Sequence, residues 1–79
     1  MSNLADELSA HISAKYNGGA AITGEDSLFY SGMIDSLGIA EIARFLSDKV
    51  GRTLDATEIV ENDFDTVNLL VQWATGASA

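Results

Sequence analysis

Ser36 is the side chain whose type and position most suggest chemistry, because it lies in Asp35-Ser36-Leu37, where a long loop meets a predicted helix. The first backbone amides of a helix, together with its dipole, favour an anion. A phosphodiester on the Ser36 hydroxyl would therefore be stabilised there. Asp35 is a like charge and would help attachment only if a cation such as Mg²⁺ bridged carboxylate and phosphate. The alternative is that Asp35-Ser36 is an ordinary helix cap.

Other reactive groups are scarce. The chain has no cysteine, which excludes disulfides, thiolate metal sites and cysteine nucleophiles. The one histidine, His11, cannot supply a histidine-rich zinc or iron site, and we expect it at the surface or the core boundary. Ile34 replaces the first glycine of the Gly-x-Ser-x-Gly pattern of serine hydrolases. Asp63 and Asp65 lack the spacing of a calcium loop. We therefore expect no catalytic residue and no metal site.

Composition narrows the class of protein further. The 79 residues are 47% hydrophobic and 20% charged, which is typical of one small globular domain. Twelve acidic residues against four basic ones give a net charge of −8, which argues against binding nucleic acid or an anionic membrane. No apolar run exceeds three residues. We therefore expect a cytoplasmic protein without a membrane span. The acidic charge leaves partners with basic surfaces open.

Apolar residues recur with helical spacing in two long segments. The first predicted helix spans 3–17, with Asn3 as its N-cap and Gly18-Gly19 as its stop. The second spans 36–50 and ends at Gly51. Their core-facing residues are Leu4, Leu8, Ile12, Tyr16, Ile39, Ile42, Ala43, Leu46 and Val50.

Two further helices are expected after the second. Asp55-Ala-Thr-Glu58 has the arrangement of a capping box and predicts a short helix of about a turn and a half. The last helix is expected to be capped by Asp65 and stopped by Gly76. Its apolar residues are Val67, Leu69, Leu70, Val71, Trp73 and Ala74.

The segment 17–35 is too long for a simple connection between helices. Gly24 and Gly32 are expected to provide turns with positive φ. Its apolar residues, which predict that it packs onto the helices, are Ile22, Leu28, Phe29 and Ile34.

The fold class expected from these elements is all-α. No segment alternates with the period of a strand. We predict a four-helix bundle of three main helices and one short helix, with a long first loop. It forms a single domain over residues 1–79, with a core from about 4 to 74 and a C-terminal tail over 75–79.

The run from Asp26 to Gly38, Asp-Ser-Leu-Phe-Tyr-Ser-Gly-Met-Ile-Asp-Ser-Leu-Gly, resembles the attachment region of phosphopantetheine-dependent carrier proteins. Asp35-Ser36-Leu37 matches the Asp-Ser-Leu motif of that family. The tripeptide alone is a weak signal. Its position at a helix start, the preceding Gly-apolar-apolar turn, the acidic charge and four predicted helices extend the resemblance over most of the chain.

The resemblance implies the fold of a carrier-protein bundle and a function for Ser36. A phosphopantetheinyl transferase would attach 4′-phosphopantetheine from coenzyme A to Ser36, with Asp35 and Leu37 flanking the cofactor site. A ligase would load an acyl or aminoacyl group onto the thiol of the arm as a thioester, and downstream enzymes would process it. The chain itself would be a non-catalytic monomer. Because it has no cysteine, the thioester can be borne only by the prosthetic group.

A carrier also needs a surface on which partner enzymes dock. Leu37, Glu41, Arg44 and Asp48 share one face of the second helix by their spacing. They are expected to form such a surface, and the alternative is a solvated face with weak ion pairs. The acidic segment 55–65 could steer basic partners, or could equally consist of caps and surface charge.

The expected class of carrier depends on where this sequence differs from carriers of general fatty acid synthesis. Carriers of general fatty acid synthesis have a strongly acidic second helix, whereas 36–50 contains only Glu41 and Asp48 as acids. Asp26-Ser-Leu-Phe29 and Glu61-Asn-Asp-Phe-Asp-Thr-Val67 look more like specialised aminoacyl, peptidyl or acyl carriers. We favour a specialised carrier loaded by a dedicated ligase. A general carrier of fatty acid or polyketide synthesis is one alternative, and an unmodified helical interaction domain is another.

Overall fold

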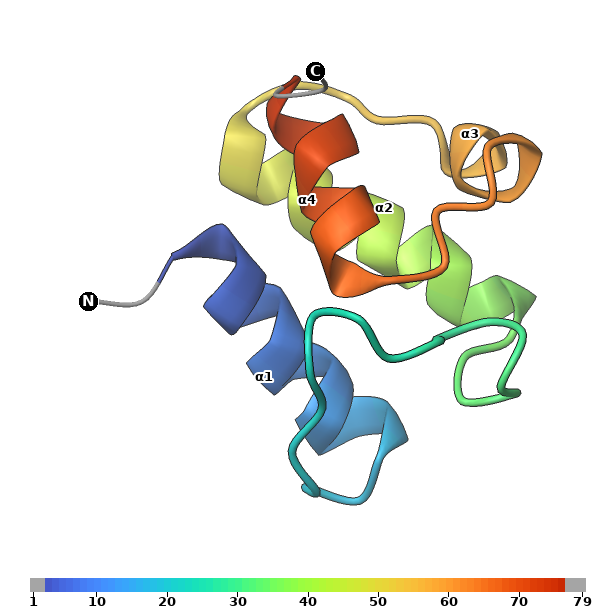
Figure 1. The fold of residues 1–79 in the computed structure, drawn as a ribbon. Helices are drawn as coiled ribbons and strands as arrows, with labels where there is room; N and C mark the ends of the chain where they lie inside the picture. Colours follow the sequence, from blue (N-terminus) through green and yellow to red (C-terminus); the bar gives the residue numbers. More distant parts are fainter. Residues whose placement is uncertain (1–2, 77–79) are drawn as a thin grey trace.

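The computed structural model describes residues 3–76, which form four helices and no strand in that range. The helices are α1 (Leu4–Tyr16), α2 (Ser36–Val50), α3 (Ala56–Glu61) and α4 (Val67–Thr75). Figure 1 shows α2 running behind α4, with short α3 at one side and the long loop crossing from the end of α1 to the start of α2. The all-α class, with three main helices and one short one, is therefore confirmed.

Most helix ends are set by the residues predicted to set them. The Asn3 side chain accepts a hydrogen bond from the Asp6 amide at 2.9 Å, and Asp35 caps α2. Gly51 ends α2 in the left-handed conformation with φ of 75°. Gly76 does the same for α4, which therefore includes Thr75. The rest of the expected tail, residues 77–79, lies outside the described residues.

Three local predictions are wrong. Thr66, not Asp65, caps α4, because its side chain accepts from the Leu69 amide at 3.2 Å. Asp55 caps α3 through the Thr57 amide rather than through the Glu58 amide, so the capping box does not form. Gly24 does not have positive φ.

Gly24 instead lies where the loop closely approaches the side chain of Asn68. A Cβ atom at this position would lie 2.4 Å from Oδ1 of Asn68. The Gly24 carbonyl also accepts a hydrogen bond from the Asn68 amide at 3.1 Å. The loop therefore lies directly against the start of α4.

The core is assembled from all four helices and from the long loop. Its buried residues are Leu8, Ile12, Leu28, Ile34, Ile42, Ala43, Leu46, Leu54, Ile59, Val67, Leu70 and Ala74. Leu28 is fully buried and Ile34 is 3% exposed, which confirms that the loop packs onto the helices. In the part of the chain that the structure describes, no helix combines the length and apolarity needed to cross a membrane.

Candidate functional site

Ser36 is exposed at the first residue of α2. Asp35 performs the capping, since its Oδ1 accepts from the Gly38 amide at 2.9 Å and its carbonyl accepts from the Ile39 amide at 3.0 Å. Among the hydrogen bonds of residues 3–76, none involves the Ser36 hydroxyl. An ordinary cap therefore explains Asp35 and leaves Ser36 without a structural role.

The start of α2 suits a phosphodiester on Ser36. The amides of Ser36 and Leu37 precede the first acceptor that the helix itself supplies. They are therefore oriented for an anion, together with the positive end of the helix dipole. The exposed hydroxyl leaves space for a long substituent. These features fit a phosphopantetheine group, with Asp35 beside it as a like charge.

Gly38 fixes the start of α2 against the rest of the molecule. It is buried, and a Cβ atom there would lie 2.4 Å from Cγ2 of Ile34 and 3.2 Å from the Tyr16 ring. The first turn of α2 thus packs closely on the loop and on the end of α1. Ser36, two residues earlier in the same turn, remains exposed.

Asp65 holds the loop that leads to Ser36, a role that the sequence interpretation missed. Its carboxylate accepts the Ser27 hydroxyl and three successive backbone amides, of which that of Phe29 is the closest at 2.6 Å. Its carbonyl also accepts from the Leu28 amide at 2.8 Å. The Asp65 carboxylate is therefore the common acceptor for loop residues 27–30.

The charge of Asp65 is favoured by these donors. Partial burial opposes ionisation, but the Ser27 hydroxyl and the amides of residues 28–30 outweigh it and hold the pKa of Asp65 below its ordinary value of 3.8. The carboxylate is thus ionised, and at full strength as an acceptor, at neutral pH.

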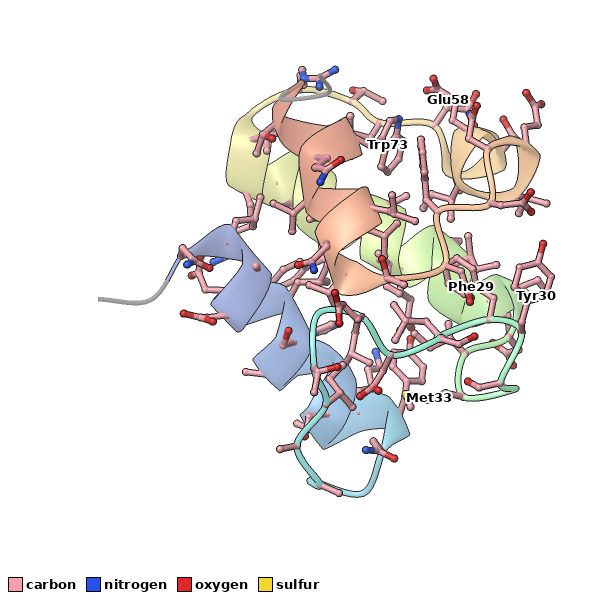
Figure 2. All side chains as sticks on the ribbon, viewed as in Figure 1. Phe29, Tyr30, Met33, Glu58 and Trp73 are labelled. Carbon is pink, nitrogen blue, oxygen red and sulfur yellow. The ribbon has the colours of Figure 1, made fainter. Side chains whose placement is uncertain are left out.

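Tyr30 forms the outer part of this loop. It is 76% exposed, and its hydroxyl donates to Asp63, whose backbone φ is +54°. Figure 2 shows Tyr30 at the outer edge of the molecule, below α3. A small apolar hollow of about 110 Å³ lies between the loop, α2 and α3, and its lining residues are Phe29, Tyr30, Ile39, Ile59, Val60 and Asp63.

Two other large apolar side chains are exposed near these elements. Leu37 at the start of α2 is 76% exposed, as the sequence predicts, and Val60 on α3 is 61% exposed. Val60 and Tyr30 were not anticipated as surface residues. A local sequence pattern gave no signal for either, because their exposure depends on where the loop and α3 meet.

The expected docking residues divide into two groups. Glu41, Arg44 and Asp48 line a shallow hollow of about 270 Å³ between α1 and α2, together with His11, Lys15 and Phe45. Leu37 does not line this hollow. Glu41 is engaged by the Lys15 ammonium at 2.6 Å and by the Tyr16 hydroxyl, which together hold the pKa of Glu41 below its ordinary value.

His11 is a partly buried side chain stacked on Phe45, with ring centroids 4.6 Å apart. This agrees with its predicted place at the core boundary. Its Nε2 atom is buried and has no hydrogen-bond partner among the described residues. It is therefore not hydrogen-bonded to Ser36, as an activating base would be.

Within residues 3–76, no cluster of three or more His, Cys, Asp or Glu side chains is arranged to hold a metal ion. Comparisons with family models, curated proteins and solved structures find no match to this chain.

Proposed function

We propose that this chain is a carrier protein in which Ser36 bears 4′-phosphopantetheine, whose thiol carries an acyl or aminoacyl group as a thioester. The protein acts in the cytoplasm as a non-catalytic monomer. Its partners are a phosphopantetheinyl transferase, a ligase that loads the cargo, and downstream enzymes that process it.

The observation that carries the proposal is the exposed Ser36 hydroxyl at the start of α2, released from capping by Asp35. The close packing of Gly38 and the hydrogen bonds of Asp65 support it, because they hold the segments on either side of Ser36 in place. A rigid attachment point next to open solvent suits a mobile arm that must reach several enzymes.

The attachment of phosphopantetheine to Ser36 needs no catalytic residue from this chain. The Ser36 oxygen forms a bond to the phosphorus next to the pantetheine arm of coenzyme A. The pyrophosphate bond breaks, and the adenosine bisphosphate half leaves with the electron pair. The transferase accepts the hydroxyl proton. The thioester later forms on the arm, outside the polypeptide.

The surface of α2 supports a specialised carrier rather than one of general fatty acid synthesis. Of its two acids, Glu41 is paired with Lys15 at 2.6 Å. Asp48 has no ion-pair partner within residues 3–76. The uncompensated negative charge on α2 is therefore even smaller than its two acidic residues indicate. We infer that a dedicated ligase loads the carrier. The most specific candidate for the cargo is an aminoacyl group.

Intact-mass measurement tests the proposal directly. The protein is incubated with coenzyme A, Mg²⁺ and a broad-specificity transferase. We expect the wild-type chain to gain the mass of one phosphopantetheinyl group and Ser36→Ala to gain none, while the circular-dichroism spectra of both remain helical. Ser31→Ala removes an exposed serine hydroxyl of the same loop, which donates to the Ser27 carbonyl at 2.6 Å, and this control should still gain the group.

An unmodified helical interaction domain is the second candidate, and the exposure of Tyr30, Leu37 and Val60 favours it. It predicts no mass gain under any of these conditions. If the wild-type chain stays unmodified beside a carrier protein that the same transferase modifies fully, the carrier proposal is wrong.

A further inference from the structure

One carboxylate, that of Asp65, collects the hydrogen-bond donors of four successive loop residues. The Ser27 hydroxyl and the amides of residues 28–30 all donate to it, the amides over 2.6–3.2 Å. These donors lie at least 35 positions before Asp65 in the sequence. Hydrogen bonds to an ionised acceptor are among the strong ones in proteins. Without the carboxylate, these donors lose their shared acceptor.

The loop transmits this restraint to the start of α2. The Leu28 carbonyl accepts a hydrogen bond from the Ile34 amide at 2.9 Å. Ile34 is 3% exposed, and its Cγ2 atom lies against Gly38. A continuous series of contacts therefore runs from Asp65 through Leu28 and Ile34 to the first turn of α2, where Ser36 lies.

We propose that Asp65 is a positioning residue for the modification of Ser36, which it aids by holding the loop surface that the transferase contacts; this inference rests on the carrier function proposed above. The surface includes Tyr30, whose amide is bound by Asp65. Neither the Ser36 hydroxyl nor Asp35 is a hydrogen-bond partner of Asp65, and Asp35 caps α2 through the Gly38 amide, so this cap should persist when the Asp65 carboxylate is lost. The loss should therefore weaken recognition of the carrier and leave the bond-forming step nearly intact.

The neighbouring carboxylate provides a matched control. Asp63 lies two residues away and accepts the Tyr30 hydroxyl, but no loop amide. Asp63→Asn and Asp65→Asn remove the same charge from the same segment, and asparagine tolerates the positive φ of position 63. Asp65→Ala removes the acceptor entirely. If Asp65→Ala does not fold, Asp65→Asn carries the test alone.

Two measurements are made on the full-length chain. Hydrogen exchange of the Phe29 and Tyr30 amides should be roughly tenfold faster or more in Asp65→Ala, while the Leu70 amide in α4 exchanges at the wild-type rate. The Leu28 amide should change less, because it also donates to the Asp65 carbonyl at 2.8 Å. In transferase assays, Asp65→Ala and Asp65→Asn should raise the KM for the carrier, by roughly tenfold for Asp65→Ala, with kcat within about twofold of the wild-type value. Asp63→Asn should change either quantity much less.

Each outcome has a separate meaning. If the wild-type chain gains no phosphopantetheine, the proposed function fails and the role of Asp65 in modification fails with it. If the wild type is modified but Asp65→Asn and Asp63→Asn raise KM equally, the effect is one of charge, and only the inference about Asp65 is overturned. Circular dichroism gives the folded fraction of each variant, and a rise in KM for Asp65→Asn no larger than the reciprocal of that fraction would also overturn it.

Discussion

Gly38 shows how a single residue can be required by its surroundings rather than by its backbone angles. It lies inside α2, where glycine is less favourable than alanine by about 1 kcal/mol. The space for a side chain is nevertheless taken by Ile34 and Tyr16. The benefit of close packing between loop and helix therefore outweighs the helix propensity that alanine would add.

We expect Gly38→Ala to lower the free energy of unfolding by up to about 2 kcal/mol, because an overpacking cost of about 1–3 kcal/mol is only partly offset by a gain of about 1 kcal/mol in helix propensity. Urea unfolding followed by circular dichroism measures the difference. Ala40→Gly, on the exposed side of the same helix, isolates the propensity term and should cost about 1 kcal/mol. A Gly38→Ala variant more stable than wild type would contradict the packing argument.

Polar contacts join α1 to α2 at two places, one near each end of α1. Lys15 and Tyr16 engage Glu41 near the end of α1, and Lys49 pairs with Glu7 at 3.0 Å near its start. Partial burial, followed by the hydrogen bond to Glu41, raises the pKa of Tyr16 from 10.0 to about 12. The protonated phenol is therefore favoured in the folded state.

This shift makes stability depend on alkaline pH. The pKa of Tyr16 is higher in the folded state than in the unfolded state, so its contribution is complete below pH 10.0 and is lost as the pH rises through about 12. We expect the free energy of unfolding to fall over this range, and to fall less in Tyr16→Phe.

The comparison of Tyr16 with Tyr16→Phe should be made in two proteins that both carry Tyr30→Phe, because the hydrogen bond to Asp63 also raises the pKa of Tyr30. Both keep the Lys15–Glu41 ion pair, so their difference reports on the Tyr16 phenol. Urea unfolding at several alkaline pH values, with tyrosinate absorbance, provides the measurement. Equal losses in the two proteins would show that Tyr16 is not the group responsible.

The helices themselves were largely predictable. The spacing of apolar residues and the capping pairs around 36–50 predict α2 with the bounds that it has. α1 ends within one residue of its predicted limits on each side. These signals are local, since a helix is decided by residues within a few positions of each other. The failures at Gly24 and Asp65 have the opposite origin, because each residue contacts a segment at least 35 positions away.

The same distinction applies to the candidate site. Its central residue, Ser36, could be placed at a helix start because the motif and the cap are adjacent in sequence. Asp65 could not be connected to it, because a carboxylate ahead of Thr66 and Val67 has the same local pattern as a helix cap. Only the folded chain shows which acceptor the loop amides use.

Over the whole molecule, positive charge is confined to a small part of the chain. The segments 16–43 and 53–79 contain no Lys or Arg. Lys15, Arg44 and Lys49 lie along α1 and α2, while Arg52 donates to the Ala74 carbonyl at 2.8 Å. The loop and α3, on either side of the exposed Tyr30, therefore present negative charge without compensation. This arrangement favours long-range attraction to a basic partner.

We expect the kcat/KM of the transferase for this protein to fall by roughly tenfold when NaCl rises from about 0.01 M to about 1 M, as the Debye length shrinks from about 30 Å to about 3 Å. Replacing Glu58 and Glu61 of α3 by Gln should lower kcat/KM at low salt and flatten the dependence. Asp6→Asn with Glu7→Gln, the same change on α1, should have a smaller effect. Equal effects at both places would indicate net charge rather than its location.

The distance in sequence between the loop and Asp65 also sets the order in which the molecule can be built. During synthesis, residues 27–36 emerge well before residue 65 and before α4, on which the Asn68 contact to Gly24 depends. Contacts between distant positions form late in folding, because a large loop must close first. The segment around Ser36 therefore reaches its final shape only once residues 65–68 have left the ribosome.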